Sequence, residues 1–503
     1  MKRLSCATMD ANTAKVVEVE SAFVRALPGF SIVGLPSQAI QESRDRIKSA
    51  LLSTGFSFPA QKITVNLSPS DLRKEGSHFD LCIALLIALQ KEKVHFEDFF
   101  VFGELGLDGK VKATVTLFSL ILSLASTRTT LKVLVPKIMA DQVAVIPNVT
   151  VYGVESLEEA LAFFKETTNQ EKALHVQEHD LFAKALVIEG EPFTCNEVFT
   201  LDFADVKGQD RAKRAALIAA AGMHNILFEG SPGCGKSMSV KRLRYILPPM
   251  SVQEVLESAA YRSLNGEEST FEPLRPYRAP HHTSSRPSIF GGGSSHAKVG
   301  EVALAHRGIL FFDEFPHFSK SILESLREPL EDGHVLISRV NAKISYETKF
   351  LFAAAQNPCP CGNLFNQEQP CRCTDVEIQR YKARLSIPLL DRIDLYVQMD
   401  ETKEAQIGMS SAQMYAKVLE AFKAQKRRKQ QELNALMSDQ EVNRFCRLDE
   451  TSTQVLQMAA NRYGLSQRGI NKTLKVARTI ADIDRAENIQ KTHLLEALSY
   501  RQR

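Results

Sequence analysis

The stretch ILFEGSPGCGKSMSV places a glycine-rich loop between an apolar run and a segment without helix breakers. Gly230 is followed after four residues by Gly235, Lys236 and Ser237. Glycines let backbone N–H groups turn inward around a phosphate, and the N-terminus of the following helix adds partial positive charge. The lysine reaches the β- and γ-phosphate oxygens, and the serine hydroxyl is a ligand for Mg²⁺. We therefore predict a site for ATP and Mg²⁺, with nucleotide contacts from Gly230, Ser231, Pro232, Gly233, Cys234, Gly235, Lys236 and Ser237.

Polar side chains also follow two later apolar runs. In GILFFDEF, Asp313 and Glu314 directly follow four apolar residues, and KFLFAAAQN ends in Asn357. A carboxylate at the end of a buried strand is suited to hold the Mg²⁺ shell, and the next one is suited to polarise the attacking water. We assign these roles to Asp313 and Glu314, and we expect Asn357 to orient the water against the γ-phosphate. A turn residue is the alternative for Asn357.

Four cysteines lie close together in NPCPCGNLFNQEQPCRC, as Cys359-x-Cys361 and Cys371-x-Cys373. Four thiolates can close a tetrahedron around Zn²⁺, although Cys-x-Cys is tighter than the usual spacing. Disulfides are disfavoured, because scattered single cysteines elsewhere indicate a reducing, cytosolic setting. An iron–sulfur cluster is the alternative to zinc. We expect a rigid surface insert at a subunit or DNA interface, without a catalytic role.

The elements that must position these residues divide the chain of 503 residues into several regions. Residues 1–165 alternate strand and helix signals, which predicts a compact α/β domain. Residues 166–200 are polar and without a stable period, and we predict a linker there with at most a short helix. Residues 201–400 alternate strands with helices and hold nearly all the chemistry, whereas residues 401–503 are helical throughout.

Composition excludes several classes of protein. The net charge is only +3, so no global field recruits nucleic acid or acidic membranes. No apolar run approaches the roughly 18 residues of a membrane span, and the first residues lack the apolar stretch of a secretory signal. We expect a cytoplasmic protein with no membrane partner.

Several long motifs resemble one family across essentially the whole chain. They include GSPGCGKS, YRAPHHTSS, GEVALAHRGILFFDEF, AAAQNPCPCG and LSQRGINKTLKVARTIADI. They are similar to the ComM/YifB family of magnesium-chelatase-like AAA+ ATPases, which is associated with natural transformation. The resemblance implies an α/β AAA+ core with a C-terminal helical lid. It also implies a homo-hexamer that drives branch migration of DNA junctions, with single-stranded and branched DNA and recombination proteins as partners.

The same resemblance carries roles to individual residues. Asn357 matches the sensor-1 position, and Arg392 in LLDRIDL matches the arginine finger that reaches the neighbouring subunit's γ-phosphate. Arg468 in LSQRGINK matches sensor 2 on the lid, while Arg384 is a weaker finger candidate. A guanidinium at such a position stabilises charge that develops on the phosphoryl group.

Two segments are candidates for contact with DNA. RAPHHTSSRPSIFGGGSSHAKVGEV is too polar for a core and too rich in glycine for a helix, and Arg286 and Lys298 within it are suited to phosphate contact. A hairpin is predicted in LEDGHVLISRVNAKISY, with Arg339 and Lys343 flanking its tip. A solvated hairpin without a ligand is the alternative. Zinc at His281-His282 is disfavoured, because neighbouring side chains point apart on a strand.

The first region resembles the Lon-protease/S5-like fold through NLSPSDLRKEGSHFDL and GELGLDGKV. Such proteolysis needs a serine nucleophile and a lysine base, but the aligned positions hold His78 and Phe118, and Ser77 is one residue away. We therefore expect the fold without the protease dyad, acting in DNA or partner contact or in ring assembly. A chelatase-type ATPase that remodels a protein during metal insertion is the alternative to a DNA motor.

Overall fold

The computed structural model describes residues 2–10, 12–96, 98–165, 184–268, 270–292, 298–338, 343–366, 369–399 and 408–501. The chain forms two units. The first comprises residues 1–183, 259–271 and 340–344, and the second comprises the remaining residues.

A mixed seven-stranded sheet is the centre of the first unit, in the order β3-β4-β2-β1-β5-β8-β9. Pairing is antiparallel from β1 through β2 to β4 and parallel at β3–β4 and from β1 through β5 and β8 to β9. The strands are β1 (Arg3–Asp10), β2 (Thr13–Val24), β3 (Gly29–Val33), β4 (Lys62–Ser68), β5 (Phe99–Val101), β8 (Leu131–Pro136) and β9 (Val149–Val154). A small hairpin joins β6 (Glu104–Leu105) to β7 (Val111–Lys112). The helices are α1 (Gln38–Ser53), α2 (Asp80–Ala88), α3 (Leu117–Ala125), α4 (Lys137–Ala144) and α5 (Leu157–Lys165).

A five-stranded parallel sheet is the centre of the second unit, in the order β14-β17-β20-β12-β21. Its strands are β12 (Ile226–Gly230), β14 (Tyr277–Arg278), β17 (Ile309–Phe312), β20 (Leu351–Gln356) and β21 (Leu395–Met399). All residues of β12, β17 and β20 are buried, as expected for parallel strands covered on both faces. Because the strands are parallel, their carboxyl ends share one edge of the sheet, where polar side chains can meet.

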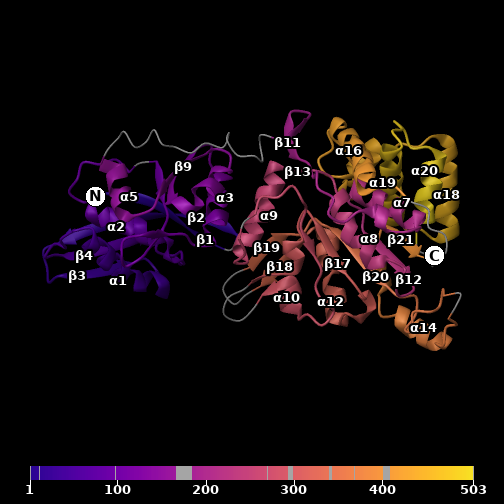
Figure 1. Cartoon of the computed structure of the whole chain (residues 1–503), viewed down its shortest axis with the longest axis horizontal. Coiled ribbons are helices and arrows are strands. Elements are labelled where there is room, and N and C mark those ends of the chain that lie inside the picture. The colour runs from indigo at the N-terminus through magenta and orange to yellow at the C-terminus, as the bar shows by residue number, and fades with distance from the viewer. Residues whose placement is uncertain are drawn as a thin grey trace. The chain divides into compact units, whose positions relative to one another are not determined.

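Helices of varied length accompany this sheet (Figure 1). They are α7 (Asp210–Gly222), α8 (Lys236–Leu243), α9 (Val252–Leu264), α10 (Arg286–Phe290), α11 (Glu301–Leu304), α12 (Lys320–Ser325), α13 (Arg327–Asp332), α14 (Asp375–Lys382) and α15 (Ile387–Leu390). Two further pairs of short strands are β15 (Gly291–Gly292) with β16 (Lys298–Val299), and β18 (His334–Ser338) with β19 (Lys343–Glu347). The second pair is the predicted hairpin.

The C-terminal region is helical, as predicted, and it packs on the sheet domain through α7. Its helices are α16 (Ser411–Arg427), α17 (Asp439–Phe445), α18 (Glu450–Tyr463), α19 (Gln467–Ile483) and α20 (Lys491–Ser499). Figure 1 shows α16 and α19 beside α7, and their apolar side chains share one core with Phe228 and Val397 of the sheet. The mixed α/β class, the parallel sheet and the helical C-terminal region are confirmed.

The segment predicted as a linker contains structure that the sequence did not reveal. Residues 166–183 lie outside the described residues, but β10 (Leu186–Ile188) and β11 (Glu191–Thr194) form a hairpin that pairs with β13 (Met250–Ser251). The strands have only three and four residues, so they show no usable period. Phe193 anchors the hairpin, because it is buried against Phe422 of α16.

Candidate nucleotide site and cysteine cluster

The glycine-rich loop lies between β12 and α8, at the carboxyl edge of the sheet. Gly233 and Gly235 have φ angles of +84° and +96°, in the left-handed region that side chains with a Cβ rarely adopt. Residue 230 must be glycine for another reason. A Cβ on Gly230 would lie only 2.6 Å from the Met399 carbonyl oxygen of β21. These constraints give a compact turn whose backbone can surround a phosphate.

Lys236 is the centre of the site. Its side chain is buried, and its Nζ donates to the carbonyl oxygens of Gly230 at 2.6 Å and Ser231 at 2.9 Å. A third bond, of 3.1 Å, goes to Oδ1 of Asn357. Burial lowers the pKa of Lys236. The lysine therefore ties the loop to the end of β20, where sensor 1 was expected.

The two predicted Mg²⁺ ligands also meet. Ser237 at the start of α8 donates from Oγ to Oδ2 of Asp313 at 2.7 Å. Asp313 follows β17 directly, and its Oδ1 accepts the Glu314 N–H at 3.0 Å. Hydroxyl and carboxylate oxygens are the ligands that Mg²⁺ prefers, so the donor set fits this ion. The structure thus brings Lys236, Ser237, Asp313 and Asn357 together from three neighbouring strands.

The side chain of Glu314 takes no part in these hydrogen bonds. Its φ of +51° is left-handed, which is costly for a residue with a Cβ and is common at functional sites. Its carboxylate lies 3.2 Å from Nδ1 of His282. Sequence reasoning considered His282 only as a metal ligand, and it expected the His281 and His282 rings to point apart on a strand. They lie in a turn with centroids 4.2 Å apart, so that expectation was wrong.

Arg392 and Arg468 converge on one carboxylate that sequence reasoning missed. Both donate hydrogen bonds to the carboxylate of Glu331, near the end of α13. Arg468 donates to Oε1 at 2.6 Å, and Arg392 donates to Oε2. Arg392 is buried and also donates to the Pro388 carbonyl at 2.5 Å. Arg384 is exposed and lies 3.4 Å from the Pro316 carbonyl. If Arg392 is an arginine finger, its side chain must therefore break its hydrogen bond to Glu331 in order to reach another subunit.

A buried polar network fixes the backbone beside Arg392. Asn225 donates its side-chain amide to the Arg392 carbonyl, and its backbone N–H donates to Asp394, both at 2.9 Å. Asp394 also pairs with Lys472 of α19 at 2.9 Å. Burial opposes ionisation, yet Lys472 and His224 hold the pKa of Asp394 well below its usual range. The network joins the finger candidate to both the sheet and the lid.

The DNA-contact candidates are only partly described. Arg339 lies outside the described residues, and the side chains of Lys298 and Lys343 do as well, although their backbones lie in β16 and β19. Arg286 begins α10, and its Nε donates to Oγ of Ser325 at 3.1 Å. The expectation of phosphate contact at these four residues stays a prediction.

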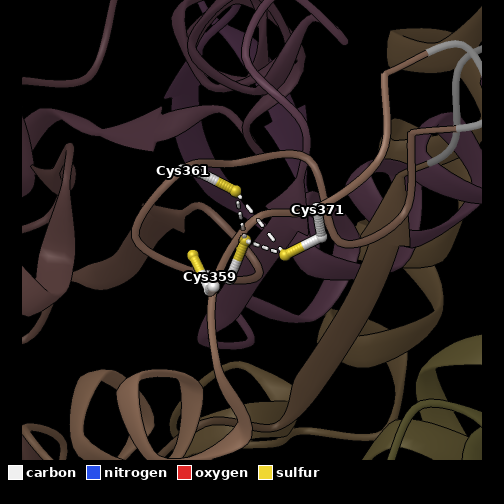
Figure 2. A group of neighbouring side chains, drawn as sticks. Cys359, Cys361 and Cys371 are labelled. Carbon is white, nitrogen blue, oxygen red and sulfur yellow. Dashed lines mark hydrogen bonds between the residues drawn. The ribbon is translucent and has the colours of Figure 1, made fainter.

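The four cysteines form a cluster, and among the described residues they are the one group of three or more side chains arranged to hold a metal. The sulfur of Cys359 lies 3.4 Å from that of Cys361 and 3.7 Å from that of Cys371, and the latter two are 3.6 Å apart (Figure 2). All four sulfurs, including that of Cys373, lie within 4.8 Å of one another. A tetrahedron with Zn–S bonds of about 2.3 Å has edges of about 3.8 Å, so the cluster fits zinc. Backbone N–H groups of Asn363 and Arg372 lower the pKa of the Cys361 thiol to about 6.

The position of this cluster differs from the expectation of a surface insert at a subunit or DNA interface. Cys359 is fully buried two residues after Asn357. Gly362, with φ of +81°, approaches the phosphate loop so closely that a Cβ would lie 2.6 Å from Cδ of Pro232. The cluster therefore belongs to the wall of the nucleotide site.

In the first unit, the residues aligned with a protease dyad make structural contacts. The His78 ring is buried against Phe79 and hydrogen-bonds the Ala7 carbonyl at 2.8 Å, and burial lowers its pKa to about 4. Ser77 donates from Oγ to the Glu104 carboxylate. Phe118 is buried in α3.

Comparison with known proteins assigns the class that this fold and site define. The description "Magnesium chelatase, subunit ChlI" matches residues 202–407, and "Subunit ChlI of Mg-chelatase" matches residues 19–138. "Magnesium chelatase, subunit ChlI C-terminal" matches residues 408–501. The chain thus carries the ATPase domain of the magnesium-chelatase class.

Relatives along the full chain define the family more narrowly. Competence protein ComM of Haemophilus influenzae is 38% identical over 499 residues, covering 97% of this chain and 95% of its own. Protein YifB of Salmonella typhimurium is also 38% identical, with 97% and 94% covered. The magnesium-chelatase 38 kDa subunit of Rhodobacter capsulatus is 23% identical, over 60% of this chain and 87% of its own. The chain belongs to the ComM/YifB family, as its motifs indicated. None of the helices in the described ranges has the length and apolar character needed to cross a bilayer.

Proposed function

We propose that the chain is an AAA+ motor that hydrolyses ATP as a homo-hexamer and drives branch migration of DNA junctions during recombination in natural transformation. The observation that carries the proposal is the convergence of Lys236, Ser237, Asp313 and Asn357 at one edge of a parallel sheet. The strand order β14-β17-β20-β12-β21 supports it, because it places the strand before the phosphate loop between β20 and β21, as AAA+ cores do. The relationship to a protein named competence protein ComM supports the biological setting.

Each residue has a definite task in this proposal. The loop amides and Lys236 hold the phosphates, and Ser237 and Asp313 hold Mg²⁺, which neutralises charge on the β- and γ-oxygens. Glu314 accepts a proton from the attacking water, and Asn357 orients that water. Arg392 and Arg468 stabilise charge on the γ-phosphoryl group, with Arg392 acting on the neighbouring subunit's nucleotide. An isolated subunit should therefore be nearly inactive.

Three smaller proposals follow from the same assignment. We propose that residues 1–165 have the Lon-protease/S5-like fold without a protease dyad and contribute to DNA contact or ring assembly. The single-stranded and branched DNA would pass along Arg286, Lys298, Arg339 and Lys343, with recombination proteins as further partners. The compartment would be the cytoplasm, because the five cysteines outside the cluster, all within the described residues, form no disulfide, which suits a reducing setting.

We also propose that Cys359, Cys361, Cys371 and Cys373 bind one structural Zn²⁺ per chain. The fit of the sulfur–sulfur distances to a four-thiolate tetrahedron supports zinc. Elemental analysis of the purified chain should give close to one zinc, and the double change Cys371→Ser with Cys373→Ser should abolish it. Two irons with labile sulfide per chain would instead favour the iron–sulfur alternative.

DNA should stimulate the ATPase through the β18–β19 hairpin. We expect binding to be largely independent of sequence and to weaken with salt, because phosphate contacts release counterions. The double change Arg339→Ala with Lys343→Ala should lower the DNA-stimulated rate several-fold and leave the basal rate nearly unchanged. The matched control is Lys417→Ala with Lys491→Ala, which removes equal charge from exposed positions on the C-terminal helices. Equal loss of basal and stimulated rates would place the hairpin in folding or assembly.

The alternative is a chelatase-type ATPase that remodels a protein partner during metal insertion. The three magnesium-chelatase matches favour it as the second candidate. The two functions predict different stimulants: DNA raises the rate of a DNA motor, whereas a chelatase subunit responds to its protein partner and is indifferent to DNA.

A further inference from the structure

The cysteine loop, defined as residues 358–374, is joined to the nucleotide site at both of its ends. It begins directly after Asn357, whose side chain accepts the hydrogen bond from Lys236 at 3.1 Å. It ends at Thr374, which caps α14 through a 3.3 Å bond from the Glu377 N–H. Near the end of α14, Tyr381 returns to this start, where the backbone N–H of Asn357 faces its hydroxyl and partly offsets the rise of its pKa that burial causes. Asn357 therefore contacts both Lys236 and the helix that follows the cysteine loop.

A second contact joins the middle of the loop to the phosphate loop. Gly362 follows Cys361, and its N–H donates to the Cys359 carbonyl at 3.0 Å, which forms a tight turn between the sulfurs. A Cβ on Gly362 would lie 2.6 Å and 2.8 Å from Cδ and Cγ of Pro232. The turn that carries the metal ligands thus rests on the phosphate loop without space for one methyl group.

Few buried apolar side chains hold this loop in place. Among its described residues, Pro358, Cys359 and Gly362 are buried, while the others are partly or fully exposed. Leu364 and Phe365 are its larger apolar side chains, and both are only partly buried. Four thiols within 4.8 Å make few favourable contacts with one another when no ion links them. A metal bound by four thiolates would link both halves of the loop, because such sites are rigid and closed.

We propose that the metal held by Cys359, Cys361, Cys371 and Cys373 controls the rate of ATP hydrolysis by fixing Asn357 and Pro232. The inference rests on the proposed ATPase function and adds a positioning role for the cysteine loop. ATP binding depends mainly on the backbone amides and Lys236, so it survives loss of the metal. Hydrolysis depends on the exact positions of Asn357 and the phosphate loop. Displacements near 1 Å at such positions lower rates by about 100-fold.

Metal removal and return on the unaltered chain is the first test. Zinc is released with a thiol-binding mercurial and a chelator, the mercurial is removed with a thiol, and Zn²⁺ is then added back. We expect kcat for ATP to fall at least about tenfold in the metal-free protein and to recover with Zn²⁺. The dissociation constant of a fluorescent ATP analogue should change less than about threefold, since the binding groups remain. Light scattering must show the same assembly size throughout.

Gly362→Ala tests the contact with the metal ligands intact. The added methyl group meets Pro232, so we expect zinc content near one per chain together with a lowered kcat. Gly464→Ala is the matched control, because Gly464 has a φ of +61° and no neighbouring atom within 4 Å of the place where an added methyl group would lie. It carries the strain of a positive φ without the contact, and its kcat should stay near the wild-type value.

The outcomes separate this inference from the proposed function. A zinc-loaded wild-type chain that hydrolyses no ATP, with or without DNA, overturns the proposed function itself. A chain that hydrolyses ATP equally well with and without zinc leaves that function standing and overturns the coupling. The coupling is also wrong if purified wild-type protein contains no metal, if Zn²⁺ fails to restore kcat, or if the lost activity tracks dissociation of the assembly.

Discussion

Glu314→Gln should leave ATP bound while hydrolysis falls by about 10²- to 10⁴-fold, the usual effect of losing a general base. The amide has nearly the same shape but cannot take a proton from water. Its neighbour His282, 3.2 Å from the carboxylate in the native chain, should still accommodate it. Equilibrium binding of a fluorescent ATP analogue and steady-state phosphate release measure the two effects separately.

Lys236→Ala is the contrasting change. It removes the bonds to Gly230, Ser231 and Asn357, so ATP binding itself should weaken. Wild-type hydrolysis by Glu314→Gln would show that the assignment of ILFFDEF is wrong. Weakened binding in Glu314→Gln, with the hydrolysis rate per bound ATP unchanged, would give Glu314 a structural role only.

Arg392→Ala should lower ATPase by about 10³- to 10⁵-fold, the range for loss of an arginine finger. Glu331 keeps Arg468 as a partner in this variant, so local structure should persist. When Arg392→Ala and Lys236→Ala subunits are mixed, part of the activity should return. Each inactive subunit then supplies across an interface what the other lacks.

Arg384→Ala is the control for the mixing experiment, because Arg384 is the exposed alternative finger. If Arg384→Ala is inactive and complements Lys236→Ala, while Arg392→Ala does neither, the finger has been assigned to the wrong arginine. Mixed hexamers of Arg392→Ala and Lys236→Ala without any recovered activity would count against a finger acting in trans.

The sequence indicates local features of the site and misses those made by distant segments. The phosphate loop and the Asp313 strand are visible because the pattern of strand, loop and helix is contiguous, and the structure brings Ser237 to Asp313. The role of Glu331 could not be predicted, because its partners are distant in the sequence. Arg392 lies just after α15, and Arg468 lies in α19. The predicted cysteine cluster was found by spacing alone.

The location of that cluster needed the structure. Gly362 and Pro232 are separated by over a hundred residues, and only the adjacency of β12 and β20 in the sheet brings them into contact. The β10–β11 hairpin was missed for a different reason. Its strands have three and four residues, too few for a two-residue alternation to stand out.

The central claim is that ATP hydrolysis moves a DNA junction, and a synthetic four-way junction with homologous arms tests it directly. Labelled junctions are incubated with wild-type protein and ATP, and their conversion into two duplexes is followed by fluorescence, with Glu314→Gln as the inactive control. We predict conversion that requires ATP, is absent with Glu314→Gln and weakens as salt rises. A preparation that hydrolyses ATP at a substantial rate yet leaves every junction unmoved would contradict the claim.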